Sequence, residues 1–257
     1  MIDVATALVP PGVSGWGTTL LLGASTLGSF ITAAFGVGGG VMLLGVMTLF
    51  MPVTAVIPLH GVVQAGSNVG RTALLWRHIR WPVLLAFAAG GVVGAGLGSQ
   101  LLVRLPQAWL ELALGAFILW SCWGPMPRMQ HGSVWRVGIG GAVTSVLTLF
   151  VGATGPFVAA FLRALRLDRF RHMATFSACM VTQHGLKIVV FGLLGFAFGP
   201  YLAFLAGMLA CGFAGTVLGR LVLGRMDDRL FRHSLTALLT LLALRLLYVG
   251  ARAALGA

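Results

Sequence analysis

The chain has 257 residues, of which 58% are hydrophobic and only 9% are charged. Soluble domains carry about 25% charged residues, so this composition cannot supply the polar exterior that a soluble fold needs. The 37 glycines favour packed helices over a β-barrel, whose strands would alternate in short segments. These observations predict an all-α polytopic membrane protein.

The net charge of +12 does not indicate nucleic acid as a partner, because the arginines fall in short gaps between apolar runs. Cys122, Cys179 and Cys211 form no C-x-x-C pair, so we expect no metal site and no disulfide framework. No cofactor is expected. Residues 1–15 contain no basic segment, so we expect no cleavable signal peptide.

Arginine, proline and glycine divide the chain into ten apolar segments. In chain order we predict helices at about 16–34, 38–51, 55–75, 82–103, 108–123, 134–151, 155–165, 170–195, 200–222 and 230–251. A transmembrane helix needs about 20 apolar residues. Eight of these helices are therefore expected to be full spans and the second and seventh to be shorter, which gives 8–10 transmembrane segments.

The positions of the arginines predict an orientation. Most of them lie in four gaps, which fall on one side of the membrane if all ten segments cross: 76–80, 124–136, 163–171 and 220–232. The positive-inside rule makes that side cytoplasmic. Both termini are then expected on the opposite side, together with Arg104 and Arg252.

The two halves of the chain resemble each other. With a displacement of 115 residues, Phe35 aligns with Phe150 and Asn68 aligns with Gln183. Five segments per half is an odd number, so the second copy must be inverted, which is the usual architecture of secondary transporters. We predict a single membrane domain with a tail at 1–15, a first repeat at 16–124, a loop at 125–133 and a second repeat at 134–254.

Glycine-rich stretches interrupt both halves at matching positions: FGVGGG at 35–40 and VGATGP at 151–156. Glycine lowers helix propensity by about 1 kcal/mol, and Pro156 suits the first turn of a new helix. Each stretch predicts an unwound turn before a half-helix whose free N–H groups attract an anion. Close helix packing is the alternative explanation.

A polar stripe marks the third segment, where five side chains project within about 100° of one helix face: His60, Gln64, Ser67, Asn68 and Arg71. Hydrogen bonds between helices would explain some of them. Because a guanidinium facing lipid is costly, the stripe favours an interior solute pathway.

In the eighth segment Gln183, His184 and Lys187 share one face, and Lys187 is the only lysine of the chain. The five acids lie in the tail, in loops or near segment ends: Asp3, Glu111, Asp168, Asp227 and Asp228. No carboxylate is therefore expected to neutralise Lys187 or Arg71 inside the membrane, and the predicted partner is a bound anion. The shortage of acids argues against a cation pore, a carboxylate proton relay and a hard-ligand metal site.

No HExxH, GxSxG or Walker A sequence is present, and no intramembrane acid could complete a hydrolytic triad, so we do not expect an enzyme.

The glycine cluster after the first span, the duplicated halves, and the stretches GATGPFVAAFL and QHGLKIVVFG resemble the sulfite exporter TauE/SafE family over roughly residues 20–250. The resemblance implies a secondary transporter of the bacterial cytoplasmic membrane that moves sulfite, sulfonates, sulfoacetate or other small anions. It maps the two repeat-start motifs onto Gly38, Gly39 and Gly40 and onto Thr154, Gly155 and Pro156. The second motif departs from the triple glycine that is common in the family.

The predicted site holds a small anion between the two breaks. Backbone N–H groups from both breaks are expected to coordinate it: Gly38, Gly39, Gly40, Thr154 and Gly155. Arg71 and Lys187 would supply charge, and the oxygens would be oriented by Gln64, Asn68, Thr182 and Gln183. His184 is a candidate for proton coupling or for a structural hydrogen bond.

Transport would occur by one repeat rocking against the other. An anion channel and a non-transporting membrane scaffold or assembly protein remain as alternatives. The coupling ion, whether proton or sodium, and a homo-oligomeric state stay open.

Overall fold

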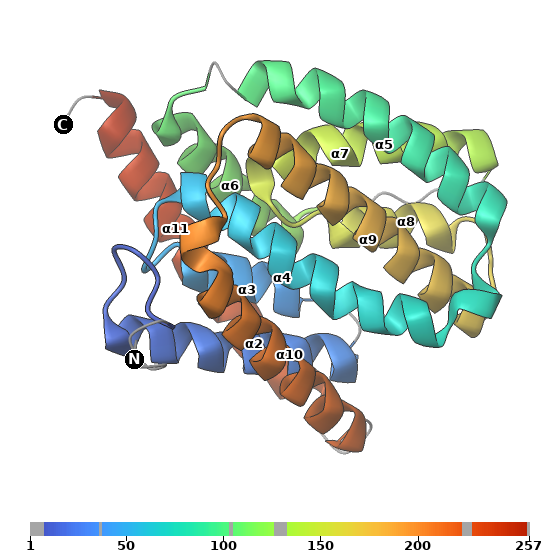
Figure 1. Cartoon of the computed structure of the whole chain (residues 1–257), viewed down its shortest axis with the longest axis horizontal. Coiled ribbons are helices and arrows are strands. Elements are labelled where there is room, and N and C mark those ends of the chain that lie inside the picture. The colour runs from blue at the N-terminus through green and yellow to red at the C-terminus, as the bar shows by residue number, and fades with distance from the viewer. Residues whose placement is uncertain (1–7, 36–37, 103–104, 126–132, 223–227, 256–257) are drawn as a thin grey trace.

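A computed structural model describes residues 8–35, 38–102, 105–125, 133–222 and 228–255. These residues form ten α-helices and two short 3₁₀ helices, with no strand among them (Figure 1). The helices are α2 (Gly15–Phe35), α3 (Gly39–Met47), α4 (Val53–Leu74), η1 (Trp76–His78), α5 (Trp81–Leu102), α6 (Gln107–Trp123), α7 (Val134–Val151), α8 (Gly155–Arg163), α9 (Arg169–Leu193), η2 (Gly199–Tyr201), α10 (Leu202–Val222) and α11 (Asp228–Leu255).

Each of the ten predicted segments corresponds to one α-helix, with ends that agree within a few residues. The prediction of an all-α fold is confirmed. Several predicted features lie outside the described residues: Gly36 and Val37 of the first glycine cluster, Arg104, most of the loop at 125–133, and Asp3 and Asp227.

Five helices of the described part of the chain are long and apolar enough to cross a membrane: Trp81–Leu102, Val134–Val151, Phe170–Leu193, Gly199–Gly219 and Thr236–Leu255. Helices α2 and α4 have 21 and 22 residues, which also matches a bilayer core of about 30 Å. Helices α3 and α8 have nine residues each and reach about 14 Å, so each is a half-helix.

The two polar helices α4 and α9 lie side by side through the middle of the molecule (Figure 1). Helix α5 packs along α7 on one flank and α10 packs along α2 on the other, while α6 pairs with α11. The half-helices α3 and α8 contact α4 and α9 respectively. The glycine-rich breaks are thus held next to the polar stripes of the central pair.

This pairing follows the correspondence that the two halves predict. If α2 to α6 correspond in order to α7 to α11, exchanging the halves turns the pair α5–α7 into α10–α2 and leaves α4–α9 and α6–α11 unchanged. Helices α4 and α9 run in opposite directions (Figure 1), with His60 next to His184 and Arg80 next to Thr175. These contacts agree with an inverted repeat, which stays a prediction.

Glycines allow the two flanking pairs to approach backbone to backbone. A Cβ at Gly94 of α5 would overlap the carbonyl oxygen of Ala142 on α7, and a Cβ at Gly215 of α10 would overlap that of Thr26 on α2. Gly94 and Gly215 thus make the same kind of contact in the two flanking pairs. Small residues at such positions let membrane helices pack closely without a hydrophobic driving force.

We expect Gly94→Ala to destabilise the protein by about 1–3 kcal/mol, because the added methyl group must push α5 away from α7. The matched control is Gly96→Ala on the same helix, where a Cβ meets nothing within 4 Å. Thermal unfolding in detergent checks both variants, and Gly215→Ala should lose as much as Gly94→Ala. Equal melting temperatures for Gly94→Ala and Gly96→Ala would contradict this packing.

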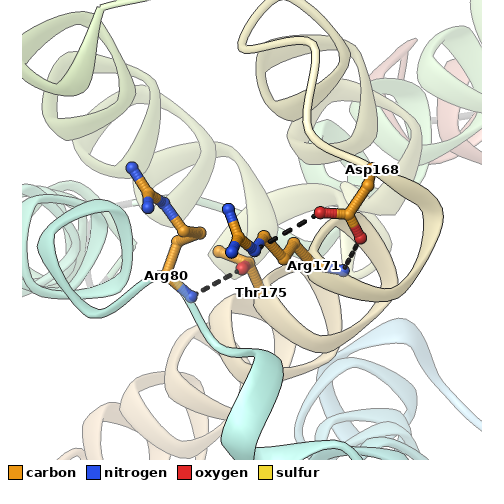
Figure 2. A network of polar contacts seen from close by, with 4 residues as sticks. All are labelled: Arg80, Asp168, Arg171 and Thr175. Atoms are coloured by element: carbon orange, nitrogen blue, oxygen red, sulfur yellow. Dashed lines mark hydrogen bonds and ion pairs between the residues drawn. The ribbon is translucent and has the colours of Figure 1, made fainter.

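Two of the arginine-rich gaps meet at one end of the central pair (Figure 2). The backbone N–H of Arg80, just before α5, donates to Thr175 Oγ1 of α9 at 3.0 Å. Asp168 caps the start of α9 by accepting from the backbone N–H of Arg171 at 3.0 Å, as N-terminal caps commonly do. The arginines of both gaps therefore lie on one side of the protein, as the orientation requires.

Candidate functional site

A cavity of about 50 Å³ lies where both breaks meet the central helix pair. Its lining comes from α3, α4, α8, α9 and the end of α2: Thr32, Gly38, Gly40, Val41, His60, Gln64, Asn68, Arg71, Ala153, Gly155, Pro156, Phe176, Met180 and His184. A water needs about 10–15 Å³ of such volume, so there is room for a few waters or an anion of similar size.

The first break places the start of α3 at the cavity. Gly38 precedes the helix with φ 103°, a conformation that glycine adopts without steric cost, and no side chain caps the helix. A Cβ at Gly39 would overlap the carbonyl oxygen of Gly28 on α2, so this glycine serves close packing. The N-terminal N–H groups of α3 and its positive dipole end are thus available to a ligand.

The second break forms the opposite wall. Helix α7 ends at Val151 and is followed by its C-cap Gly152, where φ is 75°. Helix α8 begins at Gly155 after the N-cap residue Thr154, with Pro156 in its first turn. The Thr154 hydroxyl does not cap α8. It donates instead to Gln183 Oε1 at 2.7 Å, while Gln183 Nε2 donates to Thr144 Oγ1 at 2.9 Å. Both half-helices therefore present N-termini without side-chain caps to the same cavity.

Lys187 is fully buried and has a protein partner, contrary to the expectation that only an anion could satisfy it. Its Nζ donates to the carbonyl oxygen of Gly152 at 2.9 Å. This carbonyl belongs to the C-terminal end of α7, where the helix dipole favours a positive charge. Lys187 and Gln183, one turn apart on α9, thus hold residues 152 and 154, and neither of the two side chains lines the cavity.

Helix α4 supplies the polar wall. Arg71 Nη2 donates to Asn68 Oδ1 at 3.1 Å, and the Asn68 amide donates to the backbone oxygen of Gln64 at 2.8 Å. Among the described residues, no carboxylate lines the cavity and none pairs with Arg71. Among the described residues that line the cavity, Arg71 is the only arginine or lysine. It therefore carries the fixed positive charge of the cavity.

Two buried histidines face each other across the central pair. The rings of His60 and His184 lie edge to face with centroids 6.1 Å apart. His60 Nε2 lies 2.9 Å from the carbonyl oxygen of Gly40, which requires the proton on Nε2. Nδ1 of His60 and Nδ1 of His184 have no hydrogen-bond partner among the described residues. Both histidines are among the residues that line the cavity.

The structure brings seven of the predicted site residues to the cavity wall: Gly38, Gly40, Gln64, Asn68, Arg71, Gly155 and His184. Five others are not part of the lining: Gly39, Thr154, Thr182, Gln183 and Lys187. Thr182 donates to Ala178 of its own helix at 3.0 Å. The predicted set thus divides into residues that face the cavity and residues that support its walls.

Sequence reasoning missed two features of this region. Arg245 lies inside the apolar run of α11 and donates to the backbone oxygen of Thr48 at the end of α3, at 3.1 Å. An arginine within an apolar run is a visible signal. The apolar side of the cavity, formed by Val41, Phe176 and Met180, was not predicted, because such residues do not differ from ordinary lipid-facing ones in the sequence.

The fold and this site define a multi-pass, all-helical membrane protein with a small cavity that has one polar wall and lies between two broken helices. Residues 21–246 match the family described as Sulfite exporter TauE/SafE, and the chain belongs to this family. It is also similar to the "Probable inner membrane transporter protein TsaS" of Comamonas testosteroni, with 28% identity over 168 residues. That match covers 60% of this chain and 64% of the relative, less than two thirds of its length.

No solved structure matches this chain. The family, the inner-membrane relative and the five candidate spans identify the chain as a multi-pass protein of the inner membrane.

Proposed function

We propose that the protein is a secondary transporter that moves a small anion, of the sulfur-containing class that its family name describes, across the inner membrane. One observation carries the proposal: two half-helix N-termini without side-chain caps and Arg71 line one cavity, and no described carboxylate lines it. Helix N-termini are ready-made anion sites. The descriptions of the family and of the relative, which name an exporter and a transporter, favour transport over catalysis.

The anion sits between the two breaks. Backbone N–H groups of Gly40 and Gly155 lie at the two half-helix starts, and the Arg71 guanidinium provides the charge-assisted hydrogen bond. Asn68 holds the guanidinium in place. Gln64 lies against Gly40 and is placed to orient an oxygen of the anion.

In this proposal Lys187 and Gln183 do not contact the anion but position the second break. They fix Gly152 and Thr154 and so aim the start of α8 at the anion. The positive charge of Lys187 also raises the potential in the cavity, since screening by water is weak in a buried site. Their substitution is expected to weaken anion binding through the position of the break.

The pairing of the helices supports a mechanism of alternating access. The site lies where the first break with α4 faces the second break with α9, so a rocking motion of one half against the other would open it to either side. His184 lines the cavity and its buried Nδ1 has no described hydrogen-bond partner, so in this proposal it would bind a proton along with the anion.

Flux into proteoliposomes tests this function. The reconstituted protein should take up radiolabelled sulfite or sulfoacetate with a saturable rate, and excess internal unlabelled anion should accelerate uptake by exchange. An anion channel would instead give non-saturable flux that collapses with the membrane potential. A scaffold would give no flux above empty liposomes, and either result would overturn the proposal.

A further inference from the structure

A second group of cations lies outside the cavity, where the α4–α5 connection meets the start of α9. We define the arginine surface as Arg77 of η1, Arg80 before α5 and Arg171 of α9. All three side chains are exposed. The transport mechanism uses none of them.

Contacts between the two chain segments fix this surface (Figure 2). The backbone N–H of Arg80 is bonded to Thr175 of α9, one turn beyond Arg171. The His78 ring packs on Phe170 with centroids 5.6 Å apart. Because Thr175 lies one turn beyond Arg171 on α9, the bond from Arg80 to Thr175 brings the backbone of Arg80 close to the turn that carries Arg171.

Protein groups balance only part of the charge of the arginine surface. Asp168 is engaged by Arg171, whose Nε lies 3.3 Å from the carboxylate. The hydrogen bond from the backbone N–H of Arg171 holds the pKa of Asp168 below its ordinary value. This carboxylate therefore stays ionised and bound to Arg171. Arg77 lies over the Trp76 ring at 5.5 Å. Within the described residues no acceptor contacts the Arg80 guanidinium, so the surface keeps a net positive charge.

The depth of the surface is set by the candidate spans. One span begins at Trp81, directly after Arg80, and another at Phe170, directly before Arg171. Trp76, Trp81 and Phe170 are each more than half exposed beside the arginines. Tryptophan rings concentrate at the level of the lipid headgroups. The three arginines thus lie next to the ends of two candidate spans, where lipid phosphates are expected.

We propose that the arginine surface binds the phosphate of an anionic phospholipid of the surrounding bilayer. Arg80 and Arg171 would hold the phosphate oxygens in the paired geometry that guanidinium groups favour. The exposed rings of Trp81 and Phe170 would lie along its acyl chains. Anionic lipids are attracted to basic surfaces next to membrane spans. A lipid is favoured over a soluble phosphate because the acyl chains of a lipid can cover the exposed aromatic rings beside the arginines, which a soluble phosphate cannot do.

The test compares lipids in detergent-solubilised full-length protein. We expect phosphatidylglycerol to raise the melting temperature by several degrees more than phosphatidylcholine at equal concentration, and glycerophosphate, which shares the headgroup but lacks the chains, to have no such effect. Arg80→Gln should remove most of this selective shift. Its side chain has no described partner and its backbone bond to Thr175 remains, so the variant should fold.

The matched control is Arg252→Gln, which removes another exposed arginine that lies over an aromatic ring, that of Tyr248 at 5.9 Å. This variant should keep the full shift. Equal responses to the two phospholipids, an unchanged shift in Arg80→Gln, or an equal effect of glycerophosphate would each overturn the proposal. The outcome is independent of anion transport.

Discussion

Replacing Lys187 with methionine is expected to weaken anion binding at least about tenfold while the protein still folds. Methionine fills a similar volume, and removal of a buried charge offsets much of the lost hydrogen bond to Gly152, so the melting temperature of the anion-free protein should change little. The start of α8 loses its fixed position, however, and a tenfold loss corresponds to about 1.4 kcal/mol. Titration of the melting temperature with sulfite measures the change.

Lys187→Gln separates a positioning role from a direct charge effect. Glutamine keeps a donor for the Gly152 carbonyl but removes the charge, so affinity should stay closer to that of the wild type than in Lys187→Met. Thr182→Ala is the control, since its hydroxyl bonds only within α9. Equal losses in both Lys187 variants would show that the charge, not the bond to the break, determines binding.

Arg71→Gln is expected to cause the larger loss in affinity, about 10–150-fold, because a hydrogen bond to a charged group contributes about 1.5–3 kcal/mol. Among the described residues, Arg71 is the arginine that lines the cavity, and the side chain of Asn68 is its only described hydrogen-bond partner. Uptake at low anion concentration should fall by the same factor. Arg71→Lys should recover part of the loss, because it keeps the charge without the planar fork.

Arg77→Gln is the control for Arg71→Gln. Arg77 is an exposed arginine of η1 that lies over a tryptophan ring and does not line the cavity. Anion affinity measured in a neutral detergent should be unchanged in this variant. A loss of affinity in Arg77→Gln equal to that in Arg71→Gln would mean that overall charge, rather than the cavity, attracts the anion.

The helices were predictable from the sequence because their signals are local. Apolar runs bounded by arginine, proline and glycine located the ten α-helices of the described residues, and the short runs after the two glycine clusters correspond to the half-helices α3 and α8. The stripe of α4 was also predictable: four of its five polar side chains line the cavity, since the positions on one helix face follow from the helical repeat.

The partner of Lys187 was not predictable in the same way. It is the main-chain oxygen of Gly152, 35 residues away, and every residue carries such an acceptor. The positions of the carboxylates therefore showed that Lys187 is buried without an acidic partner, but they could not identify the Gly152 carbonyl that accepts its hydrogen bond. The bond between Thr154 and Gln183 was missed for a related reason, because both had been predicted as separate contacts to the anion.

The central claim is that the cavity between the two breaks binds a small anion, and a ligand panel on the purified protein tests it most directly. Melting temperatures should be measured with increasing sulfite, sulfoacetate and acetate, in the wild type, Arg71→Gln and Lys187→Met. At least one anion should stabilise the wild type in a saturable manner, with a weaker response in both variants. If no anion shifts the wild type, and Lys187→Met behaves like it, the anion site is contradicted.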